Sequence, residues 1–221
     1  SRLVEYGSGS SVKTRILLDQ LTELEAYLPI DISREHLHAT ANNLAAEYPH
    51  HAIQPIVADF TKPINLPKAS SPQTKTCIYF PGSTIGNFTH EEASKLLHSM
   101  KTTAGERGSL LIGFDLHKEK HILEAAYNDR EGVTAQFNLN LLSRINRELD
   151  AQVDVANFDH KAIFNEEIGR IEMRLRSRQN QSIRIDEQFF HMNEGDEILT
   201  EYSHKYTVEG FTTMADEAGW S

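Results

Sequence analysis

A turn of small residues, Gly7-Ser8-Gly9-Ser10, lies near the start of the chain and directly follows the strand-like sequence RLVEY. Glycines let a backbone approach a ligand closely, and a helix that starts behind such a turn offers free N–H groups. The third glycine of the dinucleotide-binding pattern is missing, because Val12 and Lys13 occupy its place. The turn is therefore either a ligand-binding loop or a plain tight turn.

Two later acidic residues favour the ligand-binding alternative. Asp31 ends the apolar sequence YLPID, where a carboxylate can accept hydrogen bonds from both hydroxyl groups of a ribose. Asp59 and Phe60 end the sequence VADF, where they can bond an adenine amino group and cover its ring. A glycine turn combined with these two acids is typical of a site for an adenosyl ligand. The pattern favours S-adenosylmethionine (SAM), with NAD as the alternative.

Strand-like and helical segments alternate through the first half of the chain and would position these residues. Strands are expected at 2–7, 26–33, 51–60, 75–83 and 108–116, and helices at 10–24, 34–49 and 89–104. Ser33 and Thr89 are the expected N-caps of the second and third helices. This alternation predicts an α/β fold with a doubly wound parallel sheet.

The alternation stops after Leu116 and indicates a lobe inserted into the first domain. Helices are expected at 118–129 and 132–149, strands within 162–185, and a strand or the start of a helix within 194–207. A helix at 208–220 then returns to the first domain. We therefore predict a Rossmann-like domain at 1–117, resumed at 208–221, and an α+β lobe at 118–207.

The composition excludes several classes of protein. The 221 residues are 39% hydrophobic, enough for a substantial core, and the net charge of −10 argues against nucleic-acid and anionic-membrane partners. The single cysteine, Cys77, excludes an internal disulfide and fits a reducing compartment, so a cytoplasmic protein is expected. No signal peptide or membrane span is recognisable. The eleven histidines show no metal-site spacing, so no metal is expected.

Seven motifs spread over nearly the whole chain resemble those of histidine-specific N-alpha-methyltransferases. They are EYGSGSSVKTR, PIDIS, VADF, FPGSTIGNF, AAYNDREGVTAQFNLNLL, IEMRL and TEYSHKY, in this order. The sequences GSTIGN and TE-x-S are specific to that family, whereas the glycine turn is general to the class. The resemblance implies a class I methyltransferase that uses SAM to trimethylate the α-amino group of L-histidine. The product would be hercynine, in ergothioneine biosynthesis.

The resemblance assigns the methyl-donor site to the first domain. Gly7 in the turn and Lys13 on the following helix would bind SAM, with Lys13 near the donor's carboxylate. Asp31 would bind the ribose, and Asp59 and Phe60 would contact the adenine.

The inserted lobe would bind the substrate, together with Asn87 from the sequence GSTIGN. By resemblance, Asn87 holds the backbone end of the amino acid and Tyr127 makes a second such contact. Glu201 can accept a hydrogen bond from an imidazole N–H and Ser203 can serve the other nitrogen, since residues two apart on a strand share a face. Met173 would form an apolar wall. No general base or other catalytic residue is assigned.

Two alternatives remain open at this point. A related enzyme would methylate another amino acid, such as a tryptophan derivative, whose indole has one N–H and no ring acceptor. Alternatively, the chain is a truncated domain that binds SAM without turnover. Members of the family begin with a helical segment and end with further strands that this sequence lacks. We therefore expect a part of a longer or fused chain, with fusion to an iron-dependent sulfoxide synthase left open.

Overall fold

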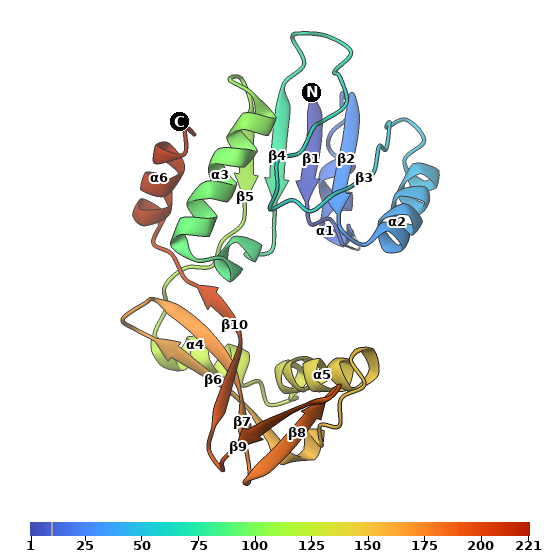
Figure 1. Cartoon of the computed structure of the whole chain (residues 1–221). Helices are drawn as coiled ribbons and strands as arrows, with labels where there is room; N and C mark the ends of the chain where they lie inside the picture. The colour runs from blue at the N-terminus through green and yellow to red at the C-terminus, as the bar shows by residue number, and fades with distance from the viewer. Residues whose placement is uncertain (10) are drawn as a thin grey trace. The chain divides into compact units, whose positions relative to one another are not determined.

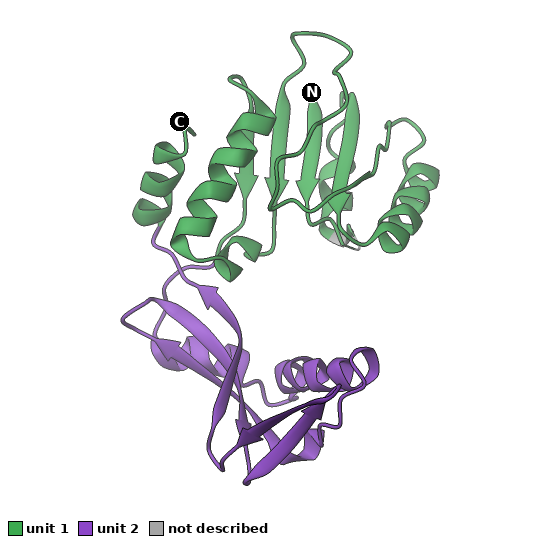
Figure 2. Cartoon of the chain, in the orientation of Figure 1, with its two compact units in different colours: residues 1–114, 208–221 green, residues 115–207 purple. Residues whose placement is uncertain are grey.

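The computed structural model describes residues 1–9 and 11–221, which form two compact units. Unit 1 contains Ser1–Phe114 and Val208–Ser221, and unit 2 contains Asp115–Thr207 (Figure 2). The chain therefore enters unit 2 slightly before the predicted residue 118 and leaves it at the predicted position.

Unit 1 is built on a five-stranded parallel sheet with the order β3-β2-β1-β4-β5. The strands are β1 (Arg2–Tyr6), β2 (Ala26–Asp31), β3 (Ile56–Val57), β4 (Thr76–Phe80) and β5 (Ser109–Ile112). Strand β1 is central, and Val4 lies between Leu28 of β2 and Ile78 of β4. The chain moves to one side of β1 and then to the other, so the predicted doubly wound sheet is confirmed.

The helices of unit 1 are α1 (Val12–Leu18), α2 (Arg34–Glu47), α3 (His90–Ala104) and α6 (Val208–Glu217), with a short 3-10 helix, η1 (Thr84–Asn87). Helix α2 lies beside β2, α3 lies beside β4, and α6 lies next to α3 (Figure 1). Thr89 and Glu92 form a reciprocal capping box at the start of α3, which confirms the predicted cap.

Apolar side chains on both faces of the strands explain why this sheet is buried. On one face, Leu3 and Tyr27 pack with Leu18 of α1 and Leu44 of α2. The alternate residues of the strands, including Val4, are also fully buried, as expected for a parallel sheet covered on both sides.

Several predicted elements of unit 1 are shorter than expected, most clearly the third strand and the first helix. The third strand contains only Ile56 and Val57, which pair with the end of β2. It is short because Pro55, just before it, has no N–H to donate, and a proline of this kind is tolerated here since β3 is the edge of the sheet. Helix α1 ends at Leu18, although Leu21 and Leu24 still pack in the core. Ser33 takes the N-cap position of α2, but its side chain makes no capping hydrogen bond.

Unit 2 contains a three-stranded antiparallel sheet with the order β10-β7-β6 and a separate hairpin. Its elements are α4 (Lys120–Tyr127), α5 (Val133–Glu148), a short 3-10 helix η2 (Val155–Asn157), β6 (Phe158–Asn165), β7 (Arg170–Ser177), the hairpin strands β8 (Gln181–Ile185) and β9 (Gln188–Met192), and β10 (Glu197–His204). The ambiguous segment 194–207 is thus mainly a strand, and β9 was not predicted.

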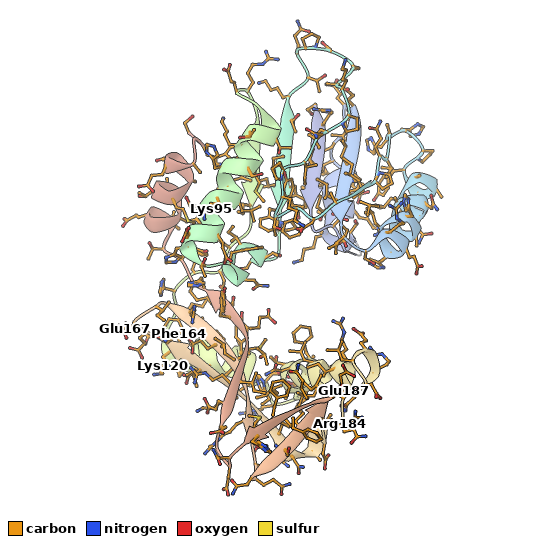
Figure 3. The ribbon with its side chains drawn as sticks, viewed as in Figure 1. Lys95, Lys120, Phe164, Glu167, Arg184 and Glu187 are labelled. Carbon is orange, nitrogen blue, oxygen red and sulfur yellow. The ribbon has the colours of Figure 1, made fainter. Side chains whose placement is uncertain are left out.

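The two faces of the three-stranded sheet differ in chemistry. One face packs against Leu123 of α4 through Ala162, Phe164, Ile171 and Met173 (Phe164 is labelled in Figure 3). The opposite face carries an ion-pair ladder in which the buried carboxylate of Glu172 is paired with Arg170 at 2.8 Å and with Arg174. Apolar and charged residues thus alternate along β7.

Within the described residues, no helix is long and apolar enough to cross a membrane, and no group of His, Cys, Asp and Glu could hold a metal ion.

Candidate functional site

A pocket of about 270 Å³ lies in unit 1 at the carboxyl ends of β1 and β4. These are the two strands between which the sheet order reverses, and ligands of open α/β sheets bind at this point. The pocket is lined by Glu5, Gly7, Ser8, Gly9, Ser11 and Lys13 from the first motif and by Pro81, Gly82 and Thr84 after β4. The sequence motifs that follow β1 and β4 therefore meet at one site.

The glycine turn brings the backbone close to this pocket. Gly7 has a φ of +68°, which favours glycine, and the N–H groups of Gly7 and Ser8 both donate to Ile30 O, at 2.9 and 3.1 Å. A Cβ atom on Gly7 would lie 3.3 Å from the ring of Phe60. The turn is thus fixed to the end of β2, and a side chain at Gly7 would be in tight contact with Phe60 and strained by the positive φ, while Ser10 lies outside the described residues.

Asp31 lies directly against the glycine turn, as expected for a residue that shares a ligand with it. One carboxylate oxygen accepts a hydrogen bond from Gly9 N–H at 3.2 Å, and the other accepts from Ser33 N–H at 2.9 Å. The carboxylate is partly exposed and retains lone pairs for further donors. It can therefore accept hydrogen bonds from vicinal hydroxyl groups.

Lys13 and Phe60 also lie near the turn, whereas Asp59 has partners of its own. Lys13 is exposed, lines the pocket, and its Nζ lies 3.8 Å from the position of a Cβ on Gly82. Phe60 packs among Tyr6, Phe80 and Phe88, with ring centroids 5.6–6.4 Å away. Asp59 accepts hydrogen bonds from Thr61 Oγ1 at 2.6 Å and from Thr61 N–H at 3.0 Å and lies 3.1 Å from Lys62 Nζ, and these partners, Thr61 Oγ1 first, lower its pKa.

Glu5 is a member of the pocket that the sequence did not identify as a binding residue. It is 2% exposed, and one carboxylate oxygen accepts hydrogen bonds from Thr14 Oγ1 at 2.5 Å and from the Tyr27 hydroxyl. Burial raises the pKa of this carboxyl, while the two hydroxyl donors oppose the shift. The signal in the sequence was the acidic residue between apolar neighbours in VEYGSGS.

These groups fit a ligand that combines a nucleoside with a charged amino-acid tail. The tight backbone turn admits close approach, Asp31 supplies an acceptor for hydroxyl groups, and Lys13 supplies a cation for a carboxylate. Phe60 provides an apolar ring at the turn. The residues present are thus compatible with SAM.

In unit 2, three of the predicted substrate residues lie on the face of the sheet that α4 covers, and a fourth lies on α4 itself. Glu201 of β10 lies opposite Met173 of β7, and Ser203 lies opposite Ile171. Met173 is 4% exposed and packs in the same cluster as Tyr127, the last residue of α4. Distant parts of the sequence therefore meet around Glu201 and Ser203.

The carboxylate of Glu201 is free to accept a hydrogen bond from a ligand. Burial raises the pKa of its carboxyl, and no hydrogen bond or cation within the described part of the chain offsets that effect. Ser203 is 7% exposed, and its Oγ accepts a hydrogen bond from Lys205 Nζ at 2.9 Å. The same Nζ lies 2.9 Å from Tyr127 Oη. Lys205 was not predicted, because its partners are far apart in the sequence.

The raised pKa of Glu201 predicts a gain in stability for Glu201→Gln. Burial in the folded state disfavours the ionised form of the Glu201 carboxyl, so protonation of this group favours folding. That stabilisation is complete below the unfolded-state pKa of about 4.3 and is lost as the pH rises through the raised folded-state pKa. We expect the variant to melt about 1–3 °C above the parent at pH 7.5. The difference should disappear at pH 4, and an equal difference at both pH values would contradict the shift.

A buried amide holds the surroundings of Glu201 in place. Asn138 of α5 is 0% exposed, and its Oδ1 accepts a hydrogen bond from Thr200 Oγ1 at 2.7 Å, at the bulge of β10 that precedes Glu201. Its Nδ2 donates to His160 Nδ1 at 3.0 Å, and His160 Nε2 donates to the carbonyl oxygen of Tyr127 at 2.8 Å. This network links the strand of Glu201 to the helix end of Tyr127.

Replacing Asn138 by alanine should therefore destabilise unit 2. The change leaves His160 Nδ1 and the carbonyl oxygen of Arg174 without the donor that Asn138 supplies, while Thr200 Oγ1 keeps only Met173 O as acceptor, and such a loss costs about 1–3 kcal/mol. Denaturant unfolding should show this loss, whereas alanine at the exposed Asn140 of the same helix should change stability by less than about 0.5 kcal/mol. A loss below 0.5 kcal/mol for Asn138→Ala would show that the network contributes little.

Asn87 belongs to unit 1, where it is the exposed last residue of η1. The N-cap of α3 is Thr89, so Asn87 does not cap that helix.

Comparison with known proteins agrees with these observations. Residues 1–221 match the family described as histidine-specific methyltransferase, SAM-dependent. The chain is 38% identical to the histidine N-alpha-methyltransferase of Mycolicibacterium smegmatis, over 98% of this chain and 68% of that protein. It is 24% identical to ergothioneine biosynthesis protein 1 of Schizosaccharomyces pombe, over 92% of this chain and 27% of that protein. It is 26% identical to the L-tryptophan methyltransferase of Psilocybe serbica, over 98% of this chain and 66% of that protein. The family match and the first identity confirm the resemblance of the motifs, and the chain belongs to the SAM-dependent histidine-specific methyltransferases.

Proposed function

We propose that this protein transfers three methyl groups from SAM to the α-amino group of L-histidine and releases hercynine, a step of ergothioneine biosynthesis. The observation that carries the proposal is the half-buried carboxylate of Glu201, which has no donor within the described residues and shares a strand face with the Ser203 hydroxyl. An imidazole ring has one nitrogen for each of these groups.

The backbone end of the substrate requires different partners. We assign Asn87 and Tyr127 to the amino and carboxylate groups, because an amide both donates and accepts and a phenol can donate to a carboxylate. Met173, buried opposite Glu201, would supply the apolar wall beside the ring. We assign unit 2 as the lobe that binds the histidine side chain.

The methyl donor would be held in unit 1. We assign Gly7 and Lys13 to its amino-acid end, Asp31 to its ribose, and Asp59 and Phe60 to its adenine. SAM supplies an electrophilic methyl group when bound. The side chains have to hold a neutral amine in line with that group and exclude water, and orientation of this kind accounts for a large part of such rate enhancements. Tyr127 can also stabilise the quaternary product by cation–π contact.

The comparisons favour histidine over a tryptophan derivative, because the identity to the histidine enzyme is higher than that to the tryptophan enzyme. The test is an assay of the protein, as encoded in full, with SAM and either L-histidine, L-tryptophan or L-phenylalanine. We expect turnover with histidine and at least 100-fold lower kcat/KM with the other two, on the order of the discrimination that a polar site achieves. Binding of S-adenosylhomocysteine without turnover of any of them would support a non-catalytic SAM-binding domain instead.

We further propose a cytoplasmic location, which the single cysteine, Cys77, supports.

A further inference from the structure

A buried lysine in unit 2 connects two of the proposed substrate contacts. Lys205 directly follows β10 and is 2% exposed. Its Nζ lies 2.9 Å from Tyr127 Oη, 2.9 Å from Ser203 Oγ and 3.2 Å from Asp115 Oδ2. An ammonium group has three N–H donors, and here each has one acceptor. The hydrogen-bond donors of this buried cation are thus all satisfied, by groups from three separate segments of the chain, one of which is a carboxylate.

The direction of these hydrogen bonds determines what both hydroxyl groups can do. An ammonium group donates and cannot accept, so Tyr127 Oη and Ser203 Oγ are both acceptors toward Lys205. Each hydroxyl has a single proton, which therefore has to point away from Lys205 toward another acceptor. Both groups are in this way prepared as donors on the face of the sheet that carries Glu201.

We infer that Lys205 is a positioning residue that turns the O–H groups of Tyr127 and Ser203 toward the substrate and so makes the site selective for a neutral imidazole in one tautomer. This inference rests on the proposed function. Ser203 donates to the unprotonated ring nitrogen, and Glu201 accepts from the N–H of the other nitrogen. An imidazolium carries N–H groups on both nitrogens, so one of them would face the donor proton of Ser203. Tyr127 donates to the substrate carboxylate.

The chain offers a matched control for this role. Lys118 pairs with the same Asp115 carboxylate, at 2.7 Å from Oδ1, but it is exposed and is not hydrogen-bonded to Tyr127 or Ser203. Lys118→Met and Lys205→Met thus each remove a cation from Asp115, and only the second change releases the two hydroxyl groups.

The experiment is calorimetric titration of L-histidine into the full protein saturated with S-adenosylhomocysteine, with steady-state kinetics beside it. The parent protein must bind histidine, and if it does not, the proposed function itself fails and this inference fails with it. We expect Lys205→Met to raise the Kd and KM of histidine by about 10- to 100-fold, as for loss of charge-assisted hydrogen bonds. In Lys205→Met, the Kd of S-adenosylhomocysteine should stay within about twofold of the parent value. In Lys118→Met, the Kd and KM of histidine should also stay within about twofold, the ordinary scatter for independent sites.

A double-mutant cycle separates positioning from a general loss of structure. If Lys205 acts through Ser203, the loss for Lys205→Met combined with Ser203→Ala is smaller than the product of the single losses. Lys205→Gln, which keeps two N–H donors, should recover part of the affinity and decides the matter if the methionine variant does not fold. Any of three results would overturn the inference. They are losses of histidine affinity that are independent in the cycle, equal losses of affinity for Lys118→Met and Lys205→Met, or an unchanged histidine Kd in the Lys205 variants.

Discussion

Glu201→Ala is expected to lower kcat/KM for L-histidine by about 10- to 100-fold, which corresponds to about 1.5–3 kcal/mol for a hydrogen bond to a charged group. The carboxylate is half-buried and has no donor within the described residues, so a bound imidazole N–H would be its partner. Without it, that N–H would be left unpaired in the site. Steady-state kinetics with histidine would measure the loss.

The same variant should also lose selectivity. A site that hydrogen-bonds a polar substrate rejects analogues without that group by large factors, because its own polar groups stay unpaired. Removal of Glu201 should therefore narrow the preference for histidine over phenylalanine. Glu187, exposed on the hairpin of unit 2 and labelled in Figure 3, provides the control, and Glu187→Ala should match the parent. Undiminished discrimination by Glu201→Ala would refute the imidazole assignment.

Asp31→Ala should weaken binding of S-adenosylhomocysteine by about 10- to 100-fold, because the ribose hydroxyls would lose an ionised acceptor. The Asp31 carboxylate accepts hydrogen bonds from Gly9 N–H and Ser33 N–H, and these bonds fix it against the glycine turn. The change removes the acceptor of both N–H groups. Calorimetry measures the affinity directly and does not require turnover.

Asp216 on α6 offers a matched acidic control within unit 1, since it is exposed and its side chain makes no hydrogen bond among the described residues. Asp216→Ala should bind S-adenosylhomocysteine as the parent does. An unchanged affinity in Asp31→Ala would remove Asp31 from the donor site.

The sequence predicted those elements whose stability depends on local pattern. The apolar strands β1, β2 and β4 and the capped helix α3 were recognised, because continuous burial and the Thr89 cap leave clear signals. The hairpin strand β9 was missed. Its turn is formed by Asp186, with a φ of +54°, and Glu187, and it lacks the glycine-containing residue pair that is typical of such turns.

The candidate sites show the same division. The glycine turn and Lys13 line the pocket at the ends of β1 and β4, and Asp31 accepts a hydrogen bond from the turn, so the sequence pattern predicted residues that lie together in unit 1. The network of Lys205 could not be predicted, because its partners Asp115, Tyr127 and Ser203 meet only in the folded chain. Asn138 and His160 were missed for the same reason, as polar residues on an amphipathic helix and a strand have many roles.

The position and number of the transferred methyl groups test the central claim most directly. The full protein is incubated with L-histidine and SAM that carries an isotope-labelled methyl group, and the product is examined by fragmentation mass spectrometry. The account predicts three labelled methyl groups on the α-nitrogen and an unmodified imidazole ring, because Glu201 and Ser203 occupy both ring nitrogens. A label on the ring, or a labelled product from tryptophan and none from histidine, would contradict it.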